Sequence, residues 1–85
     1  MRSSVNLVEG LQMQTKTVGE RIRYLRDRNH MTQKALAERL YVLQQTVSSW
    51  ETGRTNPDLV LIVEISTLFH VSLDYLLTGK ANHTL

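Results

Sequence analysis

The sequence predicts an all-α protein, a compact bundle of five short helices. Apolar residues recur at helical spacing along most of the 85-residue chain, which contains one proline and four glycines. The chain contains no cysteine, so disulfides and thiolate metal sites are excluded. Its longest apolar run is too short to span a bilayer. These features predict a small soluble domain that is held together by packing.

Helix signals are confined to residues 17–79, which we predict to be the folded domain. Residues 1–16 show no clean apolar period and are predicted to be an N-terminal extension, either a disordered leader or an arm that stabilises a dimer. Residues 80–85 are predicted to be a short C-terminal tail.

The first helix is predicted to begin after Thr17, which can form a capping box with Glu20, and to end at Asn29 and His30. Its apolar residues share one face, and its arginines are predicted to point away from that face. The apolar residues are Val18, Ile22 and Leu25, and the arginines are Arg21, Arg23, Arg26 and Arg28.

Two more short helices are predicted to follow. Thr32 can cap the first of them, from about Gln33 to Leu40, and the other runs from about Gln44 to Thr52. Only three residues join them, so they must cross at a steep angle. The small Ala37 is predicted to lie where the two helices cross, and Gly53 is predicted to be the left-handed residue that ends the second of them. The residues predicted to face the core are Ala35, Leu36, Ala37, Leu40, Val47 and Trp50.

Asn56, Pro57 and Asp58 predict the start of a fourth helix, with Asn56 as its cap and Pro57 at its first helical position. The stretch that follows is rich in β-branched residues and would also suit a buried strand. The cap and the apolar stripe of Leu61, Ile62, Ile65, Leu68 and Phe69 favour a helix. A fifth helix is predicted from Ser72 to just before Gly79, with Val71 and Leu76 at the hydrophobic-staple positions.

Positive charge is concentrated in the first two thirds of the chain. Residues 16–56 carry eight Lys/Arg and four Asp/Glu, whereas residues 57–85 carry one lysine and three acids. This distribution suits a polyanionic partner, although solvated charged faces would also produce it.

The residues needed for catalysis or metal binding are not grouped in the sequence. His30, His70 and His83 are far apart, and Val71 and Ser72 break the helix between His70 and Asp74. Phosphate loops and serine elbows are absent as well. We therefore predict a protein that is not an enzyme and needs no metal or cofactor.

The third predicted helix is unusual because its outward residues are uncharged. Gln44, Gln45, Thr46, Ser48 and Ser49 can donate and accept hydrogen bonds, whereas a solvated helix normally carries charge pairs. Glutamine matches the donor and acceptor pattern that adenine presents in the major groove. A merely soluble surface is the alternative interpretation.

Residues 18–79 resemble the helix-turn-helix domain of phage repressors, Cro proteins and the bacterial XRE-like regulators, the lambda repressor-like fold. The resemblance rests on motifs that occur here in the family's order and spacing. They are Thr32-Gln33 before L-A-x-x-L, Ala37, Val47, Trp50-Glu51-x-Gly53, Asn56-Pro57 and the closing S-L-D-Y-L-L-T-G.

The resemblance implies that the helix from Gln44 lies in the DNA major groove. Gln44, Gln45 and Ser49 would face base edges, and Thr46 would contact a base or phosphate or make a local backbone bond. Phosphate contacts would come from Gln33, Lys34, Arg26, Arg54, Thr55 and Asn56, with a pure helix cap as the alternative for Asn56. The resemblance also implies an ion pair between Arg26 and Glu51.

Two residues depart from the family pattern in the turn between the second and third helices. Tyr41 stands where a left-handed glycine is usual, and Leu43 stands where a polar cap is usual. The turn is therefore expected either to be strained or to differ in conformation.

Together these features predict a sequence-specific regulator of transcription, a repressor that binds double-stranded DNA in the cytoplasm, in association with the nucleoid. A homodimer would form through residues 71–77, and membranes are not expected as partners. The alternative is an antitoxin or adaptor module whose main partner is another protein.

Overall fold

The computed structural model describes residues 17–80, which form five α-helices and no strand. The helices are α2 (Val18–Arg28), α3 (Gln33–Leu40), α4 (Gln44–Glu51), α5 (Leu59–Phe69) and α6 (Leu73–Thr78). The all-α prediction is confirmed, including a helix instead of a strand at α5. The predicted extension (1–16) and most of the predicted tail (81–85) lie outside the described residues.

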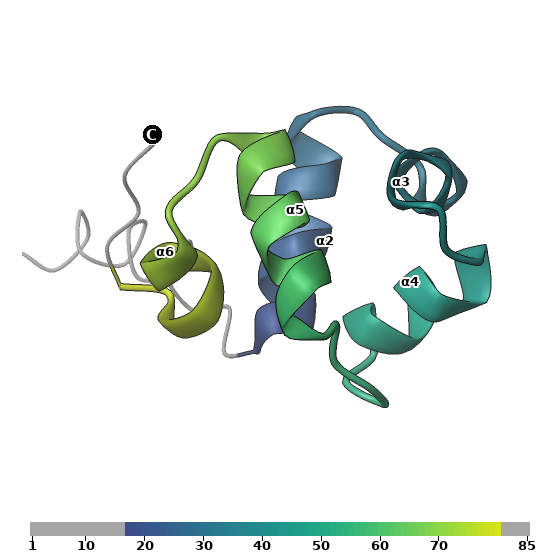
Figure 1. Cartoon of the computed structure of the whole chain (residues 1–85). Helices are drawn as coiled ribbons and strands as arrows, with labels where there is room; N and C mark the ends of the chain where they lie inside the picture. The colour runs from purple at the N-terminus through teal and green to yellow at the C-terminus, as the bar shows by residue number, and fades with distance from the viewer. Residues whose placement is uncertain (1–16, 81–85) are drawn as a thin grey trace, which may run out of the picture.

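Helix α2 is central to the arrangement, because it packs against both α4 and α6. In Figure 1, α2 and α5 lie in the middle of the view, with α3 and α4 at one end and α6 at the other. The longest described helices have 11 residues, so no helix within residues 17–80 could cross a membrane.

One apolar core joins all five helices. At the α3–α4 end, Trp50 is the largest fully buried side chain, and Ala37 is 2% exposed at the helix crossing. The predicted inward residues Leu36, Leu40 and Val47 are buried with them, whereas Ala35 is only half-buried. The core is completed by Ile22, Leu25, Ile62, Ile65, Phe69, Val71, Tyr75 and Leu76.

The prediction that all the arginines of α2 point away from the core is wrong for Arg21. This side chain is only 3% exposed, and its Nε donates to the carbonyl oxygen of Leu76 (2.8 Å) while Nη2 donates to that of Leu77 (2.9 Å). The last carbonyls of a helix lack intrahelical partners and carry partial negative charge, so a guanidinium stabilises them. Burial lowers the pKa of Arg21 from its ordinary value.

The predicted start of the fourth helix is also wrong by two residues. Asp58, not Asn56, is the cap: its carboxylate accepts from the backbone N–H of Leu61 (2.9 Å), and the helix begins at Leu59. Pro57 is buried just before the cap, where it occupies the staple position opposite Ile62. The buried ring thus precedes the cap, and α5 begins only after Asp58.

The predicted dimer segment is largely used within the monomer. Val71, Tyr75 and Leu76 are 7%, 6% and 0% exposed, so they belong to the core of this chain. Val71 and Leu76 flank the Ser72 cap as a staple, as predicted. Among the apolar residues of this segment, only Leu73 and Leu77 remain substantially exposed, at 41% and 45%.

Helices α2 to α5 end in the same hydrogen-bonded turn, in which the first or second residue after the helix is left-handed. In α3 the N–H of Val42 donates to the carbonyl of Ala37 (3.0 Å) and the N–H of Tyr41 to that of Glu38 (3.4 Å). Tyr41 has φ +60°, so the turn keeps the glycine-like conformation with a bulky residue in it. His30 and His70 occupy the same position after α2 and α5.

We expect Tyr41→Gly to raise the free energy of unfolding by about 1 kcal/mol, because glycine adopts left-handed backbone angles without a steric penalty. The Tyr41 side chain is 94% exposed, so its removal costs little packing. Denaturant unfolding would measure the change. Tyr41→Ala is the matched control, because it keeps the β-carbon and should give no comparable gain; an equal gain would contradict the strain argument.

Candidate nucleic-acid interface

Helix α4 presents an uncharged face to solvent. Gln44 and Gln45 are exposed, and Thr46 and Ser49 are half-buried. The opposite side of the helix is anchored in the core by Val47 and Trp50, which are 0% and 2% exposed. Of the four residues predicted to touch bases, Gln45 and Ser49 lie four residues apart on this outer face, and Gln44 and Thr46 lie on its two flanks.

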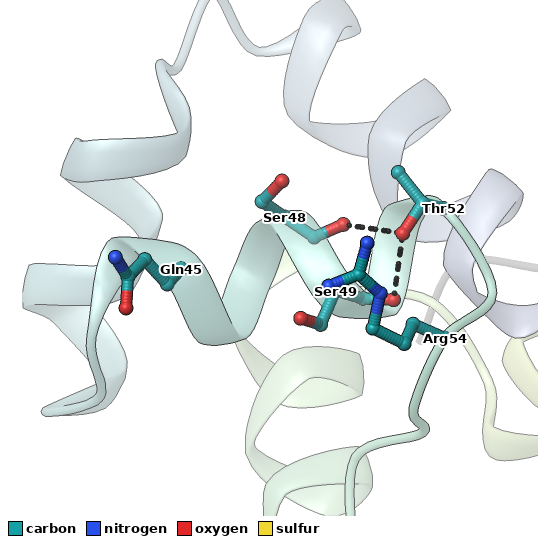
Figure 2. Close-up of a pocket in the computed structure, with 5 residues that line it drawn as sticks. All are labelled: Gln45, Ser48, Ser49, Thr52 and Arg54. Atoms are coloured by element: carbon teal, nitrogen blue, oxygen red, sulfur yellow. Dashed lines mark hydrogen bonds between the residues drawn. The ribbon is translucent and has the colours of Figure 1, made fainter.

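The outer side of α4 is hollowed where it meets the following loop. Figure 2 shows Gln45, Ser48, Ser49, Thr52 and Arg54 around this hollow, with Gln45 at one end of the helix. Ser48 and Thr52 were not among the predicted contact residues. Their spacing of three and seven from Gln45 places them on the same face of a helix, so helical periodicity would have identified them.

The loop after α4 is tied to the helix by backbone hydrogen bonds. Gly53 has φ +82°, and the N–H groups of Arg54 and Thr55 both donate to the carbonyl of Ser49, at 2.9 and 3.3 Å. The predicted phosphate-binding residues of this loop are therefore held beside α4. Asn56 is exposed and does not cap α5, so the capping alternative for it is excluded.

One carboxylate joins α4 to two other helices. Glu51, at the end of α4, accepts two hydrogen bonds from Arg26 of α2, from Nε at 2.7 Å and from Nη2 at 3.0 Å. It also accepts one from the side-chain amide of Gln33 of α3, at 3.0 Å. The side chains of Arg26 and Glu51 are only 11% and 4% exposed, so solvent screens this ion pair weakly.

Arg26 is held on its remaining side as well. Its Nη1 donates to the carbonyl of Met31 (2.7 Å) and lies 3.2 Å from a carboxylate oxygen of Asp27. The hydrogen bond with Glu51 is the main cause that raises the pKa of Arg26. Lys34, in contrast, is exposed in the first turn of α3.

A glycine allows α2 to approach the end of α4 at close range. Gly19 is buried, and a β-carbon at this position would overlap the carbonyl oxygen of Trp50 and lie 3.1 Å from the Cα of Glu51. Gly19 and Arg26 are seven residues apart, two turns on one side of α2. They therefore contact α4 from the same helix at two separate points.

The helix-turn-helix family model matches residues 22–76, which reach from α2 into α6. The chain belongs to the helix-turn-helix family. The family resemblance predicted from the sequence motifs is thereby confirmed.

Three curated relatives of this helix-turn-helix chain are named as transcriptional regulators or repressors. The activator BcrR of Enterococcus faecalis is 39% identical over 66 residues, 78% of this chain and 32% of the relative. Repressor protein C2 of Salmonella phage P22 is 35% identical over 72 residues, 85% and 33% of the two chains. DicA of Escherichia coli K12 is 38% identical over 69 residues, 79% and 51%. The chain thus spans between a third and a half of these relatives.

Two solved structures share the helix-turn-helix fold of this chain. The P22 c2 repressor in complex with a synthetic operator has a TM-score of 0.72 and 35% identity, and the match covers 78% of this chain and 100% of that one. A transcriptional regulator from Listeria innocua has a TM-score of 0.70 and 28% identity, over 81% and 64% of the two chains. The fold prediction is confirmed at this level.

Residues 17–80 contain no group of three or more histidines and acids that could hold a metal ion. His30 and His70 are exposed at the left-handed ends of α2 and α5, and His83 lies outside the described residues.

We expect Glu51→Gln to lower the free energy of unfolding by about 2–3 kcal/mol, because it leaves the largely buried charge of Arg26 with only the exposed carboxylate of Asp27 as an ionic partner. Denaturant unfolding would measure the loss. Glu38→Gln is the matched control on the exposed surface of α3 and should stay within about 0.5 kcal/mol. Equal stability of the two variants would show that the carboxylate does not hold the helices together.

We expect Gly19→Ala to destabilise the domain by about 1–3 kcal/mol, because the added methyl group overlaps backbone atoms that cannot turn aside. In an unobstructed helix the same substitution is stabilising by roughly 0.5–1 kcal/mol, so the sign of the change is diagnostic. Thermal unfolding would measure it, with Arg23→Ala on the exposed side of α2 as the control. A stabilised Gly19→Ala variant would contradict the close approach.

Proposed function

We propose that this chain is the DNA-binding unit of a transcriptional regulator, a repressor that binds a specific double-stranded site as a homodimer. The observation that carries the proposal is the exposed neutral face of α4, fixed by Val47, Trp50 and Glu51 against the rest of the domain. A rigid helix with donor and acceptor side chains on its free side suits the major groove, whose width admits an α-helix. The similar P22 c2 structure holds a synthetic operator.

In this proposal the amides of Gln44 and Gln45 contact base edges, because side chains at the start of the recognition helix reach deepest into the groove. Ser49 lies one turn further along the same face, and Thr46 is half-buried beside it. Each bidentate amide contact would favour adenine, which offers an acceptor and a donor side by side.

The groups that flank this face are assigned to phosphates. Arg54, Thr55 and Asn56 are exposed on the loop tied to α4, and Lys34 is exposed on α3. Gln33 already donates to Glu51 through its side chain, and Arg26 uses three nitrogens on protein acceptors. We assign these two residues chiefly to positioning α4, with any phosphate contact made by their remaining N–H groups.

The homodimer would use α6, where Leu73 and Leu77 lie four residues apart on one side of the helix and are 41% and 45% exposed. Two recognition helices about 34 Å apart would then enter successive major grooves of a two-fold site. Occupancy of such a site blocks access of polymerase to a promoter, which would place the protein with the nucleoid in the cytoplasm. BcrR is named an activator and the P22 protein a repressor. Expression from a reporter gene fused to the bound promoter would decide whether this chain activates or represses transcription.

Selection of binding sites from random duplexes by the 85-residue chain tests the proposal. A two-fold motif and two chains per duplex are expected. DNA binding is excluded if no duplex is selected and the chain shows no salt-dependent binding to random duplexes. Recovery of a stoichiometric protein partner would then support the alternative of an antitoxin or adaptor module.

On the selected duplex, Gln44→Ala and Gln45→Ala are each expected to weaken binding by about 1–3 kcal/mol and to relax preference at one base pair per half-site. Arg54→Ala should instead weaken binding to selected and scrambled duplexes alike and reduce the salt dependence. Fluorescence anisotropy at several salt concentrations would measure both effects.

Arg39→Ala is the charge-matched control for Arg54→Ala, since Arg39 lines a different hollow, beside Val63 and Thr67 of α5. It should change affinity less than Arg54→Ala. Equal losses on selected and scrambled duplexes for the glutamine variants would contradict their assignment to bases.

A further inference from the structure

Leu43 is a large apolar side chain left in solvent at the start of α4. It is 70% exposed, and it immediately precedes Gln44 and Gln45, which are exposed as well. The neighbouring Val42 is half-buried and packs against the core. Val42 also occupies the staple position opposite the fully buried Val47, so Leu43 is needed neither for the core nor for the staple.

Leucine at position 43 also leaves α4 without a side-chain cap. The other described helices are capped by Thr17, Thr32, Asp58 and Ser72, each of which accepts a hydrogen bond from a backbone N–H of its helix. Leu43 stands at the cap position of α4 and makes no such bond. A polar cap stabilises the start of a helix, so leucine here is unfavourable for stability.

The partner that suits an apolar group at this place follows from the chemistry of the groove. Under the proposed function, on which this inference rests, the first residues of α4 approach base edges in the major groove. The apolar group that unmodified base pairs present there is the C5 methyl of thymine. Thymine pairs with adenine, the base that the neighbouring glutamines match.

We propose that Leu43 is a specificity-determining residue that contacts a thymine methyl group, at or next to the base pair contacted by Gln44. Burial of the leucine against this methyl removes both from water, whereas cytosine at the same place offers an amino group without an apolar partner. The sequence preference of the chain therefore includes a thymine that is selected through its methyl group.

Replacement of single thymines by deoxyuridine in the selected duplex tests this contact, because it removes only the methyl group. The 85-residue protein should lose about three- to five-fold in affinity per half-site at one thymine position, as expected for one buried methyl. Leu43→Ser should bind the thymine and deoxyuridine duplexes equally at that position. This variant restores a polar cap, so we expect it to fold with at least the original thermal stability.

Leu59→Ser is the matched control, since Leu59 is also 70% exposed but lies on α5. It should keep the full sensitivity to deoxyuridine. Identical deoxyuridine profiles for the original protein and Leu43→Ser would overturn the proposed contact while leaving sequence-specific binding intact.

Two other outcomes would also overturn the inference. Selected sites with cytosine at this position, bound only after C5 methylation, would assign the methyl to 5-methylcytosine instead of thymine. Failure to select any duplex would remove the proposed function together with the contact of Leu43.

Discussion

The carboxylate of Glu51 is the group on which the arrangement of the helix-turn-helix depends. Helix α4 has only eight residues and places two apolar side chains, Val47 and Trp50, in the core. Apolar contacts are not directional, so two of them leave the rotation and tilt of a short helix poorly determined. The bonds from Arg26 and Gln33 are directional, and they fix the end of α4 against α2 and α3 at once. The outward face of α4 is a consequence of this attachment.

A small domain must satisfy its helix ends because each short helix has few other hydrogen bonds to contribute. Here polar caps begin four of the described helices, a left-handed residue follows each of the five, and the buried guanidinium of Arg21 donates to the carbonyls at the end of α6. The chain accepts strain to do so, since His30, Tyr41 and His70 adopt backbone angles that glycine adopts freely. Tight turns between short helices are obtained at the expense of stability.

The proposed recognition surface combines rigidity with uncharged chemistry. Gly19 and Arg26 contact α4 from one side of α2, and the loop that carries Arg54 is bonded back to Ser49. The side chains that the proposal assigns to bases and those that it assigns to phosphates are thus held by one connected framework. Such preorganisation lowers the entropic cost of binding, because little has to be ordered when the partner arrives.

The sequence by itself determined the features that depend on residues within about one helical turn of each other. Capping at Thr17, Thr32 and Ser72 and the apolar stripe of α5 were predictable because a cap and a helical face are local patterns. The uncharged character of α4 was visible for the same reason.

Only the tertiary structure decided what depends on distant groups. Arg21 is buried because the end of α6, 55 residues away, brings carbonyl oxygens to it. Gly19 is required because the carbonyl of Trp50 occupies the space of a side chain, and Pro57 is buried before the cap of α5 instead of opening the helix. Local patterns specify which segments become helices. Packing decides which helix ends contact each other, because it brings together residues that are far apart in the sequence.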